Sequence, residues 1–401
     1  MKQKYKYWLF VVISLIFVML CCLVPYRDIM LLNDNDYITQ EEYNKLLAST
    51  GFVKAKSVFA GGNEDLINEY AIKFKLFNLF NIKNLKVNVV KSDEVLLGGD
   101  CIGLNLKSKG VIIVGSNYII TKNGNINPMQ ESGLNNGDII LKLNDENINS
   151  LDDIKKVLDN SNGDSLTVTA KRDGNIFTTS IKPQWDIQTR SYKLGIWIRD
   201  DAMGVGTLTF VNPDNHRFAS LGHAITDSDT NQIFEVSNGE VYKANVVGVK
   251  KGKRGSPGEI LGFFMQGRDE QGTVDKNCDY GVYGYLNPDS LLVLGKSRIK
   301  VGGKLTAKPG KASILCCVDG ETIEEYSIEL IKTNYQIGAK SKNMVIKITD
   351  PRLIEKTGGI IQGMSGSPII QDGKLIGAVT HVFVNDATKG FGLYLDFMIN
   401  E

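Results

Sequence analysis

Residues 358–370 read Gly-Gly-Ile-Ile-Gln-Gly-Met-Ser-Gly-Ser-Pro-Ile-Ile, and an apolar hairpin with an Asp-Gly turn follows at residues 369–379. A nucleophilic serine needs its Oγ exposed on a tight turn, with backbone N–H groups directed at the oxyanion that forms during acyl transfer. Gly363 and Gly366 flank Ser365 and permit the close backbone approach that such a turn requires. The stretch therefore makes Ser365 a candidate nucleophile, with the N–H groups of Gly363 and Ser365 as the candidate oxyanion hole.

The same turn contains a second serine, Ser367. The order Gly-x-Ser-Gly-x-Pro, which ends at Pro368, resembles the nucleophile region of chymotrypsin-like peptidases, where a strand hairpin also follows the serine. That spacing places the nucleophile directly before Gly366, so it favours Ser365 over Ser367. The plain alternative is a Gly- and Ser-rich surface loop without chemistry.

A general base for such a serine is expected to be a histidine, because the imidazole pKa lies near neutrality and the ring can accept and return a proton. The chain has three histidines. His223 follows an apolar strand and a glycine, a context that could present the ring at a cleft. His381 lies in the strand after the nucleophile hairpin and is the alternative, whereas His216 follows a turn-like Pro-Asp-Asn sequence.

A third group must orient the imidazole and offset its charge. The sequence leaves four carboxylates open for this role: Asp350, Asp279, Asp227 and Asp386. Asp350 ends a strand-like run at residues 345–349 and precedes Pro351, which is also an ordinary strand-to-turn signature.

Composition excludes several other functions. The 401 residues include 46 Lys and Arg and 45 Asp and Glu, a net charge of +1, so nothing supports nucleic-acid binding. The six cysteines form no Cys-x-x-Cys pair and no histidine stands at metal-ligand spacing, so neither a zinc site nor a disulfide framework is expected. Serine acyl transfer requires no cofactor.

The N-terminus predicts a membrane anchor. Lys2, Lys4 and Lys6 precede an apolar run from Trp8 to Val24, which ends at Pro25. A spanning helix needs about 17–25 apolar residues, and lysines at its start favour the cytoplasmic side. A signal peptide starts in the same way, but no small-residue cleavage site follows. We expect residues 1–25 to be an uncleaved anchor and everything after Pro25 to be exported.

The exported chain divides into three ranges. Residues 26–92 form a juxtamembrane region in which the alternation between Tyr70 and Val90 predicts two short strands around Phe77 to Phe80. Residues 93–185 contain strand-like runs, a Ser-Gly-Leu-x-x-Gly-Asp-Ile-Ile motif at residues 132–140 and a helix capped by Ser150. Residues 186–401 hold the candidate nucleophile and base.

The middle range resembles a bacterial PDZ domain, which binds a peptide as an added strand between a sheet edge and a helix. This resemblance implies that Leu97, Gly98, Gly99 and Asp100 form the loop that takes a peptide carboxylate on backbone N–H groups. A PDZ fold without a ligand is the alternative.

Three segments together resemble the SpoIVB (stage IV sporulation protein B) peptidase of endospore-forming bacteria. They are Leu221–Asp227, Thr357–Ile370 and Gly377–Asp386, and weaker similarity extends through the PDZ-like range. The resemblance implies His223, Asp350 and Ser365 as the catalytic triad.

The family resemblance also implies a serine endopeptidase that cleaves itself near its N-terminus. Its substrate would be the exported part of a membrane-bound regulator, cut in the space between the mother-cell and forespore membranes to start sigma-factor processing. The expected partners are therefore this regulator, the chain itself and the membrane. The alternative from another class is a non-catalytic PDZ scaffold that tethers partners between membranes.

The expected fold is mainly β. It comprises an N-terminal transmembrane helix, a PDZ-like α+β domain and a chymotrypsin-like double β-barrel. The two barrels would meet near Val301-Gly302-Gly303, with His223 on the first barrel and Ser365 on the second.

Overall fold

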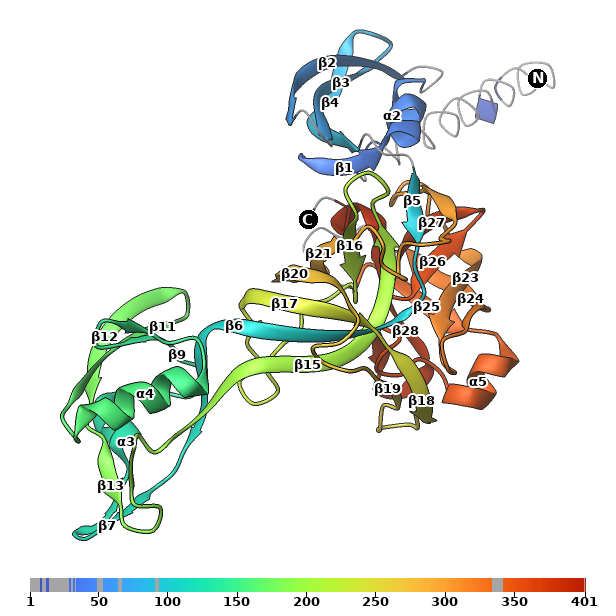
Figure 1. Cartoon of the computed structure of the whole chain (residues 1–401). Coiled ribbons are helices and arrows are strands. Elements are labelled where there is room, and N and C mark those ends of the chain that lie inside the picture. Colours follow the sequence, from blue (N-terminus) through green and yellow to red (C-terminus); the bar gives the residue numbers. More distant parts are fainter. Residues whose placement is uncertain are drawn as a thin grey trace.

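The computed structural model describes residues 8, 12–13, 29, 32, 34–48, 53–63, 67–90, 94–333, 342–399 and 401. The fold is mainly β, as the sequence predicted (Figure 1). In this described part, no helix combines the length and the apolar character that a membrane crossing requires. Most of the predicted anchor, residues 1–25, lies outside the described residues, so the anchor stays a prediction.

The N-terminal part, residues 34–90, is a small sheet covered on one face by a helix. Its elements are β1 (Asp36–Thr39), α2 (Gln40–Leu47), β2 (Val53–Asn63), β3 (Ile67–Leu76) and β4 (Phe80–Val90), with the strand order β1-β4-β3-β2. A capping box between Thr39 and Glu42 starts α2. The two strands predicted between Tyr70 and Val90 correspond to β3 and β4, which are longer than expected at ten and eleven residues, whereas β1 and β2 were not predicted.

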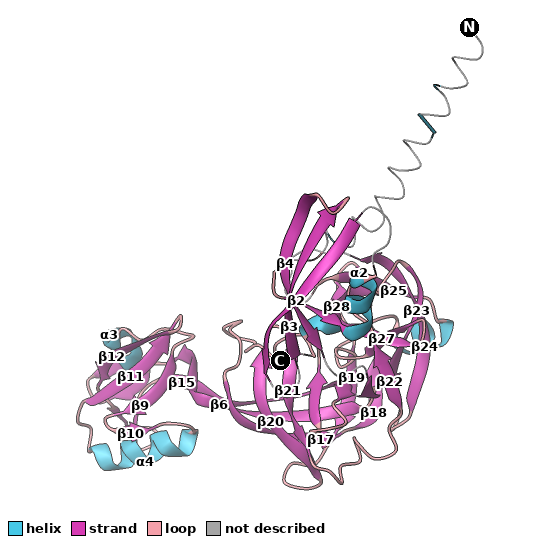
Figure 2. Cartoon of the chain, turned by 90° about the horizontal axis from the view of Figure 1, so that it is seen from above, coloured by secondary structure: helices cyan, strands magenta, loops and turns pink. Residues whose placement is uncertain are grey.

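Two long strands connect the rest of the molecule. β6 (Cys101–Ser116) and β15 (Ile196–Val211) each have sixteen residues and pair antiparallel along most of their length. One end of the pair belongs to the central sheet. The other end belongs to a separate part, residues 108–200, which we call the inserted part (Figures 1 and 2).

The inserted part has its own core and interrupts the central sheet in sequence. Residues 101–107 were predicted within the PDZ-like range, yet they pair with residues 201–207 of β15 and with β17 (Val236–Lys243) in the central sheet. The remaining elements of the inserted part are β7 (Ile119–Thr121), β8 (Gly124–Ile126), α3 (Pro128–Ser132), β9 (Ile139–Leu143), β10 (Glu146–Asn147), α4 (Leu151–Ser161), β11 (Leu166–Arg172), β12 (Asn175–Ile181), β13 (Gln184–Asp186) and β14 (Ser191–Lys193). Ser150 caps α4 as predicted, because its side chain accepts from the N–H of Asp153.

The central strands bury two main cores and form two lobes. The first lobe contains the paired ends of β6 and β15 with β16 (Arg217–Ser220), β17, β20 (Glu270–Cys278) and β21 (Gly281–Leu286). The second lobe contains β23 (Gly310–Cys317), β24 (Ile323–Thr333), β25 (Met344–Ile348), α5 (Pro351–Thr357), β26 (Pro368–Gln371), β27 (Lys374–Phe383), β28 (Asp386–Tyr394) and η1 (Leu395–Phe397). A separate hairpin, β18 (Asn245–Lys250) and β19 (Glu259–Phe263), packs against the second core.

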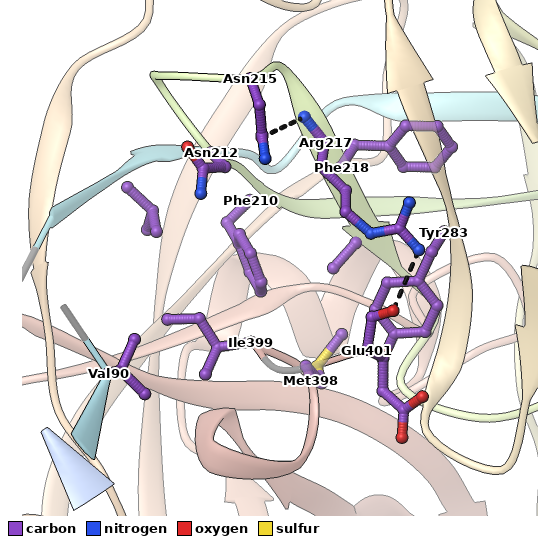
Figure 3. A pocket seen from close by; sticks show the side chains of 12 residues that line it. Val90, Phe210, Asn212, Asn215, Arg217, Phe218, Tyr283, Met398, Ile399 and Glu401 are labelled. Atoms are coloured by element: carbon purple, nitrogen blue, oxygen red, sulfur yellow. Dashed lines mark hydrogen bonds between the residues drawn. The ribbon is translucent and has the colours of Figure 1, made fainter. Parts of the chain in front are cut away.

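A short strand joins the lobes. β22 (Arg298–Val301) pairs with β5 (Glu94–Leu97) on the first-lobe side and runs parallel to β27 on the second-lobe side. The junction lies where the sequence placed it, near residue 300. The end of the chain also returns to the first lobe. There Met398 and Ile399 line an apolar cavity of about 40 Å³, and Arg217 donates to the backbone oxygen of Glu401 at 3.0 Å (Figure 3).

Candidate active site

The turn that carries Ser365 belongs to the second lobe but is held by a strand of the first lobe. Thr207 in β15 donates its N–H to the Ser365 carbonyl at 2.9 Å, and its hydroxyl to the Gly363 carbonyl at 2.8 Å. The hydroxyl of Thr209 donates to the Gly366 carbonyl at 2.7 Å. The turn is therefore fixed at the boundary between the lobes.

Two glycines give the turn its shape. Gly363 and Gly366 have φ angles of 95° and 96°, which residues other than glycine rarely adopt. A Cβ on Gly366 would overlap the Thr207 carbonyl oxygen, and one on Gly363 would press on Ile260. The sequence analysis assigned this conformational role to both glycines, and the structure confirms it.

Some backbone N–H groups of the turn donate hydrogen bonds within the protein, and others do not. Gly366 donates to Val379, and Met364 donates to Ile361. In the part of the chain that the structure describes, no hydrogen bond is recorded for the N–H of Gly363 or Ser365. These two groups, the predicted oxyanion hole, are thus available to an incoming oxyanion.

The two serines have different surroundings. Ser367 is fully buried, and its hydroxyl donates to the Met364 carbonyl at 2.7 Å, so it closes the turn internally. Ser365 is partly exposed, and its Oγ donates to the Thr380 carbonyl at 2.7 Å. Ser365 is therefore the serine of this turn that a substrate could reach, with its hydroxyl held on a backbone carbonyl.

His223 lies beside this turn, at the end of β16. Leu221 and Gly222 both adopt left-handed backbone conformations, with φ of 65° and 70°, and so turn the chain toward the second lobe. Leu221 lies directly against Gly366, and Gly222 lies against Thr380, whose carbonyl accepts from Ser365. The sequence prediction that His223 and Ser365 approach from different lobes agrees with this arrangement.

The ring of His223 is held in the tautomer that a general base needs. Its Nδ1 lies 2.8 Å from the Ala224 carbonyl oxygen. A carbonyl can only accept, so Nδ1 carries the proton and Nε2 keeps its lone pair. Burial lowers the pKa of His223, partly opposed by this hydrogen bond, so the ring is neutral at neutral pH.

His381, the alternative base, is brought to the same place. Its ring centroid lies 4.7 Å from that of His223, with an angle of 40° between the planes. Its Nδ1 is buried and has no hydrogen-bond partner among the described residues. Burial, together with the charges of His223 and Lys342, lowers the pKa of His381 to about 4. His216 lies in the turn after β15, as its sequence context predicted.

Asp350 is placed in a structural role. It caps the N-terminus of α5 by accepting from the N–H of Arg352 at 3.0 Å, and it pairs with the Arg352 guanidinium. It also accepts from the N–H of Ser327 at 3.3 Å. Hydrogen bonds to Arg352 hold the pKa of Asp350 below its usual value. Its recorded contacts do not include a histidine.

Two of the other carboxylate candidates are also engaged elsewhere. Asp227 is buried against Arg199 at 2.7 Å, and Asp386 accepts from Thr388 at 2.6 Å. Among the described residues, the only hydrogen bond of the His223 ring is to Ala224. The group that orients the imidazole here is therefore a backbone carbonyl, which no sequence pattern could have identified.

An apolar groove begins next to the candidate oxyanion hole. It has a volume of about 700 Å³ and runs between β15, β19 and the Gln362-Gly363 segment. Its apolar lining includes Met203, Val205, Ile260, Leu261, Phe263 and Phe264. Such a groove could hold an extended chain on either side of the Ser365 turn.

The predicted peptide loop, Leu97–Asp100, lies in the first lobe instead of the inserted part. Gly98 and Gly99 donate their N–H groups to the carbonyls of Thr209 and Leu208 at 3.1 and 2.8 Å. Asp100 forms a buried ion pair with Lys296. These N–H groups hold β15 and cannot take a peptide carboxylate, so the structure corrects this prediction.

The inserted part has its own groove, between α4 and the start of β15. It encloses about 870 Å³ and is lined by Leu151, Ile154 and Leu158 of α4 and by Ile196 and Trp197 of β15. Among the strands that the structure describes, β6 alone pairs with residues 196–199 of β15, so the other edge of β15 is open there. A helix facing an open strand edge is the arrangement in which a peptide adds as a strand.

The comparisons with known proteins match two consecutive ranges of the chain. The family model for the SpoIVB peptidase S55 matches residues 190–399, just over half of the 401 residues. The chain belongs to the SpoIVB peptidase family. The family match supports a peptidase, a hydrolase that acts on peptide bonds, which is the enzyme class that the sequence predicted. A PDZ domain model matches residues 99–182, which cover most of the inserted part.

One curated protein of Bartonella henselae, which carries the name of a zinc metalloprotease, is 26% identical over 134 residues. The match covers 31% of this chain and 36% of that protein, so the chain spans about a third of the length of this relative. In the described part of the chain, no group of three or more His, Cys, Asp or Glu side chains is arranged to hold a metal ion.

Proposed function

We propose that this SpoIVB peptidase is a membrane-anchored serine endopeptidase that acts outside the cytoplasm. Its substrates would be its own N-terminal region and the exported part of a membrane-bound regulator. Cleavage of the regulator between the mother-cell and forespore membranes would start sigma-factor processing during sporulation. The family match and the PDZ match support a peptidase that selects peptides, and the apolar run from Trp8 to Val24 supports an anchor.

The observation that carries the proposed chemistry is the Ser365 turn packed against Leu221, two residues before His223. In the reaction, Nε2 of His223 accepts the Ser365 proton while Oγ attacks the scissile carbonyl. The N–H groups of Gly363 and Ser365 stabilise the oxyanion. The imidazolium then gives its proton to the leaving amine, and a water activated by the same ring releases the acyl group.

The described conformation represents a resting state in this proposal. Ser365 Oγ donates to the Thr380 carbonyl, so its proton points away from Nε2 of His223. Rotation of the Ser365 side chain toward His223 would start the reaction. Such a held serine fits a peptidase that is made inactive and activates itself.

The third catalytic residue stays a prediction. The family resemblance implies Asp350, whereas the described contacts give the orienting role to the Ala224 carbonyl and a capping role to Asp350. We propose that the Ala224 carbonyl fixes the tautomer of His223 in this state.

The two lobes support a double β-barrel of the chymotrypsin type, with the site at their boundary. Each lobe has its own core, and β22 joins them. The groove between α4 and β15 is the proposed peptide site of the PDZ domain.

The test is labelling of the full chain by a fluorophosphonate reagent, which modifies an activated serine. Wild type should react, and Ser365→Ala and His223→Gln should not. Self-cleavage, followed by the loss of full-length chain over time, should stop in the same two variants. Ser290→Ala provides a control, because Ser290 is a buried serine whose hydroxyl bonds to Gln271, away from the site.

Equal labelling of wild type and Ser365→Ala would remove Ser365 as the nucleophile. A wild type that never reacts and never cleaves itself, while the PDZ groove still binds peptides, would leave the scaffold as the function.

A further inference from the structure

The N-terminal part presents a row of lysines on one face of its sheet. Strand pairing places Lys54 directly opposite Lys75 and Lys56 directly opposite Lys73. Residues directly opposite on paired strands share a face, and Lys86 joins this face because it lies opposite Ala71. We call these five residues the lysine face. The other face holds the buried core of this part, covered by α2.

This arrangement opposes folding, because like charges directly opposite each other on paired strands repel. Lys86 has one carboxylate partner, Glu69, at 3.2 Å. Among the described residues, no carboxylate pairs with Lys54, Lys56, Lys73 or Lys75. A face that concentrates positive charge in this way fits an anionic surface, which would convert the repulsion into attraction.

The turn at the end of the lysine face is apolar and exposed. Phe77, Leu79 and Phe80 join β3 to β4 and are 51%, 77% and 66% exposed. Phe77 and Asn78 have φ angles of 51° and 59°, the two successive left-handed residues of a tight hairpin turn. The backbone thus holds three large apolar side chains at the end of a rigid hairpin, one strand residue beyond Lys75.

An apolar tip next to a basic face matches the bilayer interface better than it matches an acidic protein. Lysines interact with anionic headgroups while adjacent apolar side chains enter the acyl boundary. An acidic peptide would use the lysines but would leave the tip in water. The tip therefore decides between the two partners.

The chain length allows this contact. Ten residues, 26–35, separate Pro25 from the start of β1. Ile29 and Leu32 of this segment are buried in the core of the N-terminal part, so only residues 26–28 separate that core from Pro25, a span of at most about 10–11 Å. This step rests on the proposed anchor, whereas the lysine face and the tip do not depend on it.

We propose that the lysine face and the Phe77–Phe80 tip dock the N-terminal part onto an anionic phospholipid surface. The lysines contact the headgroups, and the tip inserts into the interface. Each lysine near such a surface contributes about fivefold in affinity. Docking would restrict the distance and orientation of the lobes and the PDZ domain relative to the membrane.

The test uses the full chain with Ser365→Ala, so that self-cleavage cannot remove the N-terminal part. The protein is placed in nanodiscs of phosphatidylcholine alone or with about a third of phosphatidylglycerol. Hydrogen exchange of residues 73–86 is then compared between the two discs. We expect exchange to be several-fold slower in the anionic discs, and the difference to shrink at high salt, because screening weakens exposed charges.

Two variants and a control separate the contributions. Replacing Lys54, Lys56, Lys73 and Lys75 by Gln should abolish the difference between the discs, and Leu79→Ser with Phe80→Ser should reduce it. Replacing Lys109, Lys122, Lys142 and Lys182, exposed lysines of the inserted part, by Gln changes the net charge equally and should leave the difference intact. Unchanged exchange at Ile72 and Phe74 in detergent shows that each variant folds.

Equal exchange of the wild type in both discs would overturn the proposal, whatever the peptidase assays show. A difference that survives in the four-lysine variant would do the same. Protection of the hairpin by soluble polyglutamate that exceeds protection by anionic discs would identify an acidic protein as the partner and would also overturn it.

Discussion

The imidazole rings of His223 and His381 lie 4.7 Å apart, each in surroundings that disfavour its charged form. His223 comes from the end of β16 and His381 from β27, so each lobe contributes one ring. Two adjacent imidazolium ions would repel each other, and burial adds to the cost of charging either ring. The site is therefore built to keep both histidines neutral.

The first prediction concerns stability and pH. Burial and the charges of His223 and Lys342 lower the pKa of His381 from 6.5 to about 4. Between these values the unfolded chain binds a proton that the folded chain does not, so stability should fall as pH decreases through this window. Urea unfolding at pH 7.5, 5.5 and 4.5 measures this. His381→Gln should lose less stability over the same interval, and an identical slope in both proteins would contradict the assignment.

A related prediction concerns catalysis. His223 must be neutral to accept the Ser365 proton, and its pKa is lowered by burial. The acid limb of the kcat/KM profile should therefore fall at a pH below the ordinary histidine value of about 6.5. An acid limb at or above pH 6.5 would show that the pKa of His223 is not lowered in the free enzyme, and would contradict the prediction.

The turn glycines provide a third prediction. A Cβ at Gly366 would overlap the Thr207 carbonyl, at a φ of 96°. Gly366→Ala should cost more than about 3 kcal/mol, or displace the turn and abolish activity. Gly373→Ala is the matched control. It also lies at positive φ, 74°, but with open space around it, and should cost about 1–2 kcal/mol. Thermal unfolding and fluorophosphonate labelling compare the two.

Asp350 provides a fourth prediction. As a helix cap paired with Arg352, it should be replaceable by Asn, which caps helices well, whereas Asp350→Ala should lose about 1–2 kcal/mol. Activity per folded molecule should stay close to wild type in Asp350→Asn. A fall of about 10⁴ in kcat with an intact fold would instead establish Asp350 as the third catalytic residue.

The last prediction concerns the PDZ groove. Leu151 lies at the start of α4 in the groove lining and is exposed. Leu151→Arg should weaken binding of C-terminal peptides by about tenfold or more, because a charge enters an apolar site. Ile176→Arg changes an exposed isoleucine of β12 that does not line this groove and should leave binding unchanged. Fluorescence anisotropy of peptides selected from a C-terminal library measures both affinities. Equal affinities of wild type and Leu151→Arg would show that this groove is not the peptide site.

The sequence predicted what depends on neighbouring residues. The Ser365 turn, the left-handed glycines and the capped helix α4 all follow from local patterns that the structure confirms. The choice between Ser365 and Ser367 followed from spacing alone, and the structure places Ser367 inside the turn.

The sequence could not predict what depends on distant pairing. Gly98 and Gly99 resemble a PDZ loop, but they bond to Thr209 and Leu208, more than a hundred residues later in the chain. The contact between His223 and His381 also arises from the packing of two lobes. The bond from His223 to the Ala224 carbonyl uses a backbone atom, for which residue type carries no signal.

The insertion of the PDZ domain within the β6–β15 pair determines which parts of the chain can be deleted without disrupting the lobes. Deleting the predicted range 93–185 would remove β5 and β6, two of the three strands that pair with β15, the strand that holds the Ser365 turn. The PDZ domain is instead inserted into a β-hairpin formed by β6 and β15. These two strands are still paired at Lys107 and Asp201, where the insertion begins and ends. A chain closed there by an Asn-Gly turn would retain every strand of both lobes. The PDZ domain and the lobes can therefore be separated only by cutting within β6 and β15. An ancestor with a plain hairpin at this point would already have contained every strand of both lobes.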